Sequence, residues 1–289
     1  MTAIVVVGDA GLDVVARHDK PLPYGGDARA KIRFTGGGAG ANTALWLRSL
    51  DVGTTLVARI GNDPGGRLIR AELEAAGVRC AFAVDEEAAT CCVVVMVDAA
   101  GQRSMLADRG ANQRFRPADV TAEALAGASH LHLSGYVLLD PLSRDAGLAA
   151  LAVAKEAGLT TSVDPQAAAH ITDPAAFLAD VRGVDLLMPN TEELVALTGS
   201  ADPASAEEIL GTVGAVVVTA GLNGASWVDG SGVTTVPAVE ANCVDSTGAG
   251  DAFDAGVLSA WLSGESTVDV LRKGVRLGAS AVEKVGPQP

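Results

Sequence analysis

Short apolar runs alternate with amphipathic helical patterns along most of the chain. The apolar runs occupy residues 3–8, 55–61, 130–135, 160–164, 184–190 and 215–221. The amphipathic patterns occupy residues 41–50, 65–76, 144–157 and 191–197. Strands that alternate with helices form mostly parallel sheets whose two faces are both covered. The sequence therefore predicts an α/β fold of three layers, with a mostly parallel central sheet between helices.

Two segments interrupt this alternation. Residues 14–35 and 80–108 carry β-type runs without intervening helices. We expect them to pair as a small antiparallel sheet that forms a lid beside the carboxyl ends of the strands, where open α/β sheets bind ligands. No repeat or linker divides residues 1–289, so we expect a single domain with this lid. A second subunit can cover the lid edges, so a lid-mediated homodimer is one expected assembly and a monomer is the other.

The acidic balance of the chain limits its partners. Thirty-five Asp and Glu residues against 21 Lys and Arg give a net charge of −14, which disfavours binding to nucleic acid or an anionic membrane. No apolar run reaches the length of a membrane span, and the N-terminal residues do not read as a signal peptide. Four cysteines lack the spacing of a metal site or a disulfide framework: Cys80, Cys91, Cys92 and Cys243. We expect a cytoplasmic protein with reduced thiols.

The segment DSTGAGDAF, residues 245–253, places small residues and a carboxylate at a helix entrance. Glycines such as Gly248 and Gly250 allow a phosphate group to approach the backbone N–H groups of a helix N-terminus closely. Those N–H groups can stabilise charge that develops during phosphoryl transfer, and Asp251 can accept the proton of an attacking hydroxyl. A flexible turn in which the aspartate caps the helix is the alternative interpretation.

A second glycine cluster lies in TGGGAGANTALWL, residues 35–47, just before another helical pattern. Asn42 adds an amide that both donates and accepts hydrogen bonds. The cluster does not match a Walker-type P-loop, and it does not follow the first strand as a dinucleotide-binding loop does. Asp13, just past the first strand, either holds two hydroxyls of a polyol at the edge of the crevice or serves as a turn residue.

Two further motifs are ordinary when each is taken alone. PNTEE, residues 189–193, has Asn190 and Glu193 at the spacing of a helix capping box. VTAGLNG, residues 218–224, is a strand that runs into a glycine-rich turn.

The order of these motifs resembles that of the ribokinase-like, or PfkB, carbohydrate kinases. A glycine cluster is followed by N-x-x-E, then V-T-x-G-x-x-G and finally D-[ST]-T-G-A-G-D, and the resemblance extends from VGDAGLD to SAVEKVG. It implies a ribokinase-like three-layer α/β/α fold with a small β-sheet lid. It also implies an ATP-dependent kinase that transfers the γ-phosphate to a substrate hydroxyl and uses Mg²⁺.

The resemblance assigns roles to individual positions. The catalytic positions are Asp251 as the base and Gly248, Ala249 and Gly250 as the anion hole. The positions that hold substrate hydroxyls are Asp13, Gly37, Gly38 and Asn42. The positions of the nucleotide and Mg²⁺ region are Asn190, Glu193, Thr219, Gly221 and Gly224, with Glu193 acting on Mg²⁺ through water. In some members Asp245 and Thr247 help to enclose a monovalent cation such as K⁺, with carbonyls from a loop like 281–286.

The chain departs from the family pattern at two places. Gly135 and Tyr136 stand where ribokinases proper have an acidic residue, and DPQ at 164–166 stands where many sugar kinases have Asp-x-Asn. The loop that would complete a cation site is also short, because the chain ends soon after Gly286. These departures argue against ribose itself as the substrate.

Three substrate classes and one non-enzymatic function compete. The leading one is a small unphosphorylated sugar, because a carboxylate at position 13 repels a phosphorylated ligand. A nucleoside of the adenosine or pseudouridine type would need a stacking surface, which Tyr136 or Phe34 can supply. A sugar phosphate would need Arg103 or Arg109 from the lid region. A non-catalytic sugar- or nucleotide-binding protein would not need the acid of GAGD.

Overall fold

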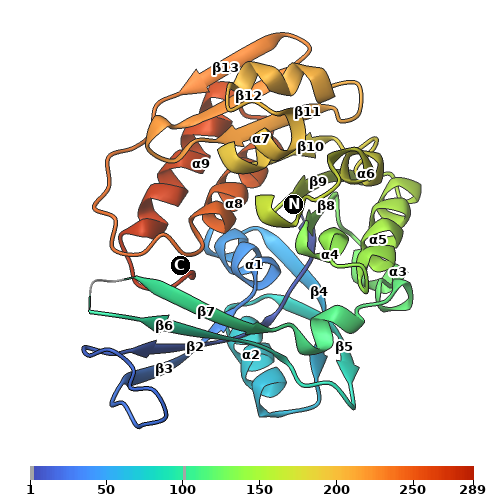
Figure 1. The fold of residues 1–289 in the computed structure, drawn as a ribbon. Coiled ribbons are helices and arrows are strands. Elements are labelled where there is room, and N and C mark those ends of the chain that lie inside the picture. The colour runs from blue at the N-terminus through green and yellow to red at the C-terminus, as the bar shows by residue number, and fades with distance from the viewer. Residues whose placement is uncertain (1–2, 100–101) are drawn as a thin grey trace.

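The computed structural model describes residues 3–99 and 102–289 and contains a nine-stranded central sheet and a separate four-stranded sheet (Figure 1). In spatial order, the central strands are β13 (Gly232–Val236), β12 (Ala225–Asp229), β11 (Ala215–Thr219), β10 (Leu186–Leu187), β9 (Thr160–Asp164), β8 (His130–Ser134), β1 (Ala3–Val7), β4 (Gly53–Gly61) and β5 (Arg79–Asp85). All pairs are parallel except β11–β12 and β12–β13. The mostly parallel central sheet is therefore confirmed.

Helices cover both faces of this sheet, so its strands read as continuous apolar runs. One face packs against α1 (Ala39–Ser49), α2 (Pro64–Ala75), α8 (Ala249–Trp261) and α9 (Thr267–Val282). The other packs against α3 (Ala122–Leu125), α4 (Tyr136–Leu139), α5 (Arg144–Glu156), α6 (Pro174–Asp180) and α7 (Thr191–Thr198). Short 3₁₀ turns are η1 (Gly110–Arg114), η2 (Pro117–Asp119), η3 (Ala168–His170), η4 (Pro203–Ile209) and η5 (Gly221–Asn223). The predicted three-layer architecture is confirmed.

Strand β1 illustrates how the two cores form. Ile4 and Val6 are buried toward α1 and α8, and Val5 and Val7 are buried toward α5. Helix α1 approaches this strand closely, since a Cβ on Gly40 would lie 2.8 Å from the Cα of Gly8. The approach brings the first turn of α1 to the carboxyl end of β1. No helix of the described residues is long and apolar enough to cross a membrane.

The four-stranded sheet projects from one end of the central sheet, at the lower left of Figure 1. Its strands, in spatial order, are β3 (Lys31–Gly37), β2 (Gly11–Arg17), β6 (Cys91–Val97) and β7 (Arg103–Asp108). The predicted segments 14–35 and 80–108 supply these strands, with two corrections. The sheet is mixed rather than antiparallel, because β2 and β6 pair in parallel. Residues 80–85 belong to β5 of the central sheet, because α2 connects β4 to β5 as a parallel crossover.

Candidate active site

Two helices, α1 and α8, begin at glycines that no other residue could easily replace. Gly38 and Gly248 have positive φ values of 96° and 75°, and neither supplies a side-chain cap. A Cβ on Gly38 would lie 2.6 Å from the carbonyl oxygen of Asp9, and one on Gly248 would lie 2.6 Å from Pro287. The first-turn N–H groups of such a helix lack intrahelical partners and carry partial positive charge. Both helix N-termini are therefore suited to a polar or anionic ligand.

A buried hydrogen bond joins these two helices. The Nδ2 of Asn42 in α1 donates to the Oδ2 of Asp251 in α8 at 2.9 Å. Burial raises the pKa of Asp251 from 3.8 to about 6, although the hydrogen bond from Asn42 opposes the increase. Asp251 is thus ionised at neutral pH yet basic enough to accept a proton. The Oδ1 of Asn42 is buried and has no partner among the described residues, so it can accept a hydrogen bond from a ligand.

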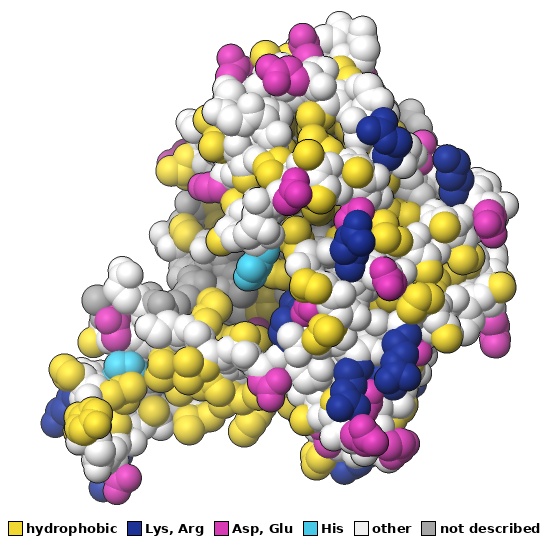
Figure 2. Space-filling model, turned by 45° about the vertical axis from the view of Figure 1, so that its right-hand side comes forward, with side chains coloured by type: hydrophobic (Ala, Val, Ile, Leu, Met, Phe, Trp, Pro, Cys, Tyr) yellow, Lys and Arg dark blue, Asp and Glu magenta, His cyan; other side chains and the backbone are white. Residues whose placement is uncertain are grey.

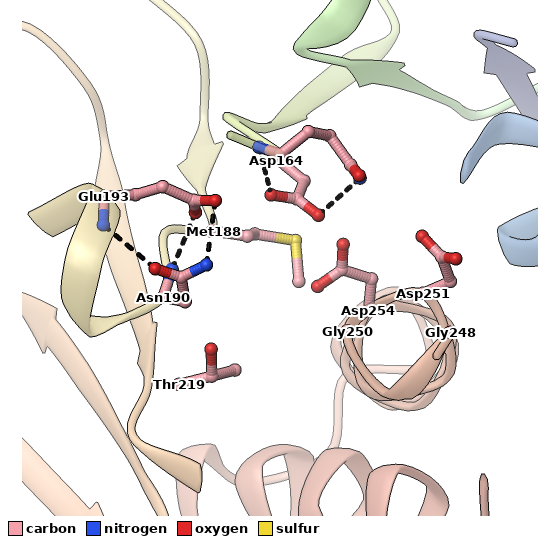
Figure 3. Close-up of a pocket in the computed structure, with 10 residues that line it drawn as sticks. Asp164, Met188, Asn190, Glu193, Thr219, Gly248, Gly250, Asp251 and Asp254 are labelled. Carbon is pink, nitrogen blue, oxygen red and sulfur yellow. Dashed lines mark hydrogen bonds between the residues drawn. The ribbon is translucent and has the colours of Figure 1, made fainter. Parts of the chain in front are cut away.

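A cavity of about 160 Å³ lies in front of the α8 N-terminus (Figure 3). Its lining residues are Asp164, Gln166, Met188, Asn190, Glu193, Thr219, Gly248, Gly250, Asp251 and Asp254. The cavity brings together six of the positions that the sequence assigned to catalysis and to the nucleotide and metal region. Its far wall is the start of α7, opposite α8.

The start of α7 has a complete capping box, as the spacing of Asn190 and Glu193 predicted. The Oδ1 of Asn190 accepts from the backbone N–H of Glu193 at 2.9 Å, and Glu193 Oε2 accepts from the backbone N–H of Asn190 at 2.8 Å. The Nδ2 of Asn190 donates to Glu193 Oε1 at 2.8 Å. Burial raises the pKa of Glu193 to about 7. A role for Glu193 toward Mg²⁺ stays a prediction.

Two further carboxyl groups in the cavity, Asp164 and Asp254, were not assigned from the sequence. Both are buried, and burial raises the pKa of each. The charge of Glu193 adds to the increase at Asp164, and the interaction with Asp164 adds to the increase at Asp254. Asp254 Oδ2 has no hydrogen-bond partner among the described residues and lies 4.0 Å from the Nε2 of the buried His132. An acid in the middle of an otherwise apolar helix, three residues after Asp251, was the signal that sequence reasoning passed over.

Asp13 lies inside strand β2, rather than in a turn past the first strand. Its carboxylate faces Gly37, where a Cβ would lie 2.5 Å from Oδ1, so the glycine makes room for the acid. Burial raises the pKa of Asp13 to about 6. Pairing of β2 with β3 brings Asp13 and Gly37 together at the root of the small sheet, next to Gly38 and the start of α1.

Arg109 lies between β7 and η1, and carboxylates already bind it. It forms ion pairs with Asp9 and Asp140, each at 3.2 Å, and its guanidinium lies 5.4 Å from the ring centroid of Tyr136. Burial, together with the charges of Asp9, Asp164 and Asp251, raises the pKa of Tyr136. Arg103, the other candidate for binding a phosphate, has a side chain outside the described residues.

Phe34 cannot stack on a ligand held by Asp13 in this arrangement. Thr35 is the cross-strand partner of Asp13, and Phe34 is the partner of Val14, so Phe34 points to the opposite face of the small sheet. Tyr136, which packs edge-on against His170, remains the aromatic candidate for stacking on a ligand.

Thr219 reaches the cavity at the end of β11, next to Asn190, with which it forms an isolated parallel bridge. The turn that follows needs its glycines, because Gly221 and Gly224 have φ values of 52° and 89°. Leu222, between them, is 96% exposed and offers an apolar surface beside the turn. The three predicted nucleotide positions therefore lie in one strand end and turn.

Asp245 ties two loops together. Its Oδ1 accepts from the backbone N–H of Thr247 at 2.9 Å, and its Oδ2 accepts from that of Gly286 at 3.1 Å. The loop 281–286 thus lies beside the start of α8, as a cation site of the predicted kind requires. Binding of K⁺ by Asp245 and Thr247 stays a prediction.

Comparisons with known proteins agree with this geometry. A family model described as pfkB family carbohydrate kinase matches residues 1–289. An ATP-dependent ribose-1-phosphate kinase of Halopiger xanaduensis is 31% identical over 265 residues, which are 91% of this chain and 86% of that protein. The adenosine kinase structure from Sinorhizobium meliloti has a TM-score of 0.89 at 24% identity and covers 100% of this chain and 96% of its own. A putative ribokinase II from E. coli, solved in complex with ATP and Mg²⁺, has a TM-score of 0.89 at 23% identity. The match covers 99% of this chain and 94% of the E. coli chain. These structures confirm the predicted ribokinase-like fold.

Proposed function

The chain belongs to the pfkB family of carbohydrate kinases, and we propose that it transfers the γ-phosphate of ATP to a hydroxyl group of a small unphosphorylated sugar. The observation that carries this proposal is the buried hydrogen bond between Asn42 and Asp251 at two helix N-termini that lack side-chain caps. One helix offers groups that can hold a hydroxyl, and the other offers an acid beside first-turn N–H groups that no side chain caps.

In the proposed mechanism Asp251 accepts the proton of the acceptor hydroxyl as its oxygen attacks the γ-phosphorus of ATP. The backbone N–H groups of Gly248, Ala249 and Gly250 stabilise the negative charge on the transferred phosphoryl group. Asn42 holds the carboxylate of Asp251 in place through Nδ2 and can accept a substrate hydroxyl at its unpartnered Oδ1. ADP leaves, and the proton passes from Asp251 to solvent when the product departs.

We assign ATP to the cavity and to the turn after β11, with Thr219, Gly221 and Gly224 as its contacts. Mg²⁺ would offset the charge of the ATP phosphates. No group of three or more His, Cys, Asp or Glu in the described part of the chain is arranged to hold a metal ion alone. Glu193 and Asn190, which line the cavity, would hold Mg²⁺ through water. Asp245, Thr247 and the loop 281–286 are the proposed site of an activating K⁺.

The charge around Arg109 supports an unphosphorylated acceptor. The carboxylates of Asp9, Asp13 and Asp140 outnumber this guanidinium, which is shared between two of them. To bind a phosphate, Arg109 would have to leave both partners and expose two partly buried carboxylates. The ribose-1-phosphate kinase among the relatives makes a sugar phosphate the natural competitor.

A nucleoside is the second candidate. Tyr136 packs edge-on against His170 at a centroid distance of 6.3 Å, and this pair of rings provides a surface for a base. The adenosine kinase among the similar structures belongs to this substrate class. Membership of the kinase family argues against a non-catalytic binding function. ATP turnover is therefore the first quantity to measure.

The substrate class is tested with a kinase assay that compares free pentoses, free hexoses, nucleosides and sugar phosphates at saturating ATP and Mg²⁺. We expect a free sugar to have the highest kcat/KM. A sugar phosphate as the best acceptor, with that preference lost in Arg109→Ala, would overturn the charge argument. A nucleoside as the best acceptor, with that preference lost in Tyr136→Ala, would select the second candidate.

We propose that the small sheet is a lid and that its apolar face is covered by a second copy of the chain. Register places the side chains of Val14, Ala16, Ile32, Phe34, Val94, Met96 and Leu106 on the face opposite Asp13. Ile32, Phe34 and Leu106 are each about 60% exposed, and Figure 2 shows hydrophobic side chains along the projecting sheet. Exposed apolar patches of this kind mark interaction surfaces.

We also propose that the protein is located in the cytoplasm.

A further inference from the structure

Residues 286–288 form a short segment that lies between α8, α1 and the small sheet (Figure 1). Pro287 packs directly against Gly248 at the start of α8, because a Cβ on Gly248 would lie 2.6 Å from the Cα of Pro287. The side chain of Gln288 reaches β3, because a Cβ on Gly36 would lie 2.6 Å from its Nε2. A displacement of this segment would therefore reach both the proposed anion hole and the strand that carries the substrate positions.

A buried hydrogen bond joins the segment to α1. The Nε1 of Trp46 donates to the carbonyl oxygen of Pro287 at 2.9 Å. The indole is 4% exposed and belongs to the core that α1 and α8 share. On the other side of Pro287, the backbone N–H of Gly286 donates to Asp245 Oδ2 at 3.1 Å. Hydrogen bonds on both sides thus hold Pro287 against Gly248.

Trp46 follows Asn42 by one helical turn, so the two side chains project from the same face of α1. Asn42 binds Asp251 directly, and Trp46 reaches Gly248 through Pro287. Helix α1 therefore contacts the start of α8 at two places. The direct contact holds the acid, and the indirect contact holds the residue at which the helix begins.

The start of α8 needs such a support, because no side chain caps it. Gly248 has a φ of 75° and no side chain that restricts its backbone. The N–H groups assigned to the phosphoryl group follow at once along the chain. Donors of this kind stabilise a transition state because they are fixed in place before the reaction begins.

We propose that Trp46 is a positioning residue, whose indole N–H holds Pro287 against Gly248 and thereby fixes the first-turn N–H groups of α8 for the phosphoryl group. This inference rests on the proposed kinase function, which assigns those N–H groups to the anion hole. Trp46 touches neither acceptor nor ATP in that assignment. Its loss should therefore lower the rate of transfer more than it weakens binding of the acceptor.

The test compares Trp46→Phe, Pro287→Gly and the double variant with the wild-type protein. Trp46→Phe keeps a large ring in the core and removes the donor, and Pro287→Gly keeps the carbonyl and removes the ring that packs on Gly248. We expect kcat to fall roughly tenfold in each, as when a buried hydrogen-bonding group loses its partner, with KM for the acceptor within about threefold. The double variant should resemble the single variants, because both substitutions break the same line of contacts.

Trp227→Phe is the matched control. Trp227 is also buried, and its Nε1 donates to Asp229 Oδ2 at 2.8 Å, but it does not line the cavity. This variant should lose a similar amount of thermal stability and keep kcat within about twofold of wild type, because it is independent of the α8 start. Hydrogen exchange of the backbone amides of residues 248–252 is a second measurement that needs no turnover. These amides should exchange faster in Trp46→Phe and Pro287→Gly and as in wild type in Trp227→Phe.

Wild-type kcat and wild-type exchange in folded Trp46→Phe and Pro287→Gly variants would overturn the inference. Additive losses of kcat in the double variant would also contradict it, because the two residues would then act independently. An equal loss of kcat in Trp227→Phe would reduce the effect to general destabilisation and reject the inference. If Trp46→Phe does not fold, Pro287→Gly decides by the same two measurements. Faster exchange at residues 248–252 in a protein that phosphorylates no sugar, nucleoside or sugar phosphate would support the contact and reject the proposed function beneath it.

Discussion

The N-termini of α7 and α8 face the same cavity, and they differ in whether side chains cap their first-turn N–H groups. Helix α7 closes its own end, because Asn190 and Glu193 bind each other's backbone N–H groups. Helix α8 begins at Gly248, which has no side chain to offer, so no side chain caps its first turn. Other helices away from the cavity behave like α7, with side-chain caps from Asp63 on α2 and Ser266 on α9. Helices α1, α4 and α5 also lack a side-chain cap, but only in α8, among the described helices, does the uncapped end carry a buried acid in its first turn and line the cavity.

The difference separates groups that stabilise the fold from groups that are left for a ligand. A side-chain cap contributes about 1 kcal/mol to helix stability, and α8 forgoes it at the one place where a phosphoryl group would approach. Glu193 belongs to both groups of residues. Its carboxylate oxygens complete the capping box of α7, and the residue also lines the cavity. Substitutions at the two ends should therefore change stability and catalysis in different proportions.

The largest effect is expected for Asp251→Asn, which keeps the size of the side chain and removes the proposed base. General-base catalysis contributes roughly 10²–10⁴-fold, so kcat should fall by about that factor. The hydrogen bond from Asn42 can still be made to the amide oxygen, so sugar binding, measured by calorimetry, should persist. Near-normal turnover in a folded variant would remove Asp251 from the mechanism.

A smaller effect on rate is expected at the α7 end. Glu193→Gln keeps the shape of the capping box but removes a charge, so the Mg²⁺ concentration for half-maximal activity should rise several-fold. The matched control is Ser266→Ala, which removes the cap of α9 and should lower stability by about 1 kcal/mol without changing Mg²⁺ dependence. If Glu193→Gln behaves like this control, Glu193 is a capping residue only.

The pH dependence gives a quantitative check on the burial of Asp251. Its carboxylate must be ionised to accept a proton, and burial raises its pKa to about 6. We expect kcat/KM to fall as the pH drops through about 6, whereas an exposed aspartate would place this limb near 4. Stability should respond with the opposite sign. The folded state holds this proton more tightly than the unfolded chain, so the contribution of Asp251 to the free energy of unfolding is lost as the pH rises through about 6.

Much of the fold followed from periodicity. The patterns at 41–50, 65–76, 144–157 and 191–197 correspond within two residues to α1, α2, α5 and α7. The pattern did not reveal β12, β13 or α9, and it placed residues 80–85 in the lid. A run of β-type residues does not indicate which of two sheets the strand joins. For β5 the preceding helix α2 determines this, because it connects β5 to β4 of the central sheet as a parallel crossover.

The site residues also fall into those that the sequence predicted and those that it did not. Motif order led to Asp251, Asn190, Thr219 and their neighbours, because glycines and capping residues have fixed spacing along the chain. Asp164, Gln166 and Asp254 come together only through the arrangement of β9 and α8. The partners of Arg109, which decide whether it can bind a phosphate, also come from distant segments. Spacing predicts groups that act within one loop, and tertiary packing selects their partners.

The most direct test of the contrast between the two helix ends is Gly250→Ala. No atom lies within 4 Å of a Cβ built at Gly250, so the protein has room for the methyl group, and alanine favours a helix over glycine by about 1 kcal/mol. The methyl group would enter open space beside the N–H groups proposed to hold the phosphoryl group, so kcat should fall at least about tenfold while the melting temperature stays level or rises. Gly211→Ala, in a turn away from the cavity with equal room, should leave kcat unchanged. Wild-type kcat in a stable Gly250→Ala variant would contradict the view that α8 is left open for phosphate.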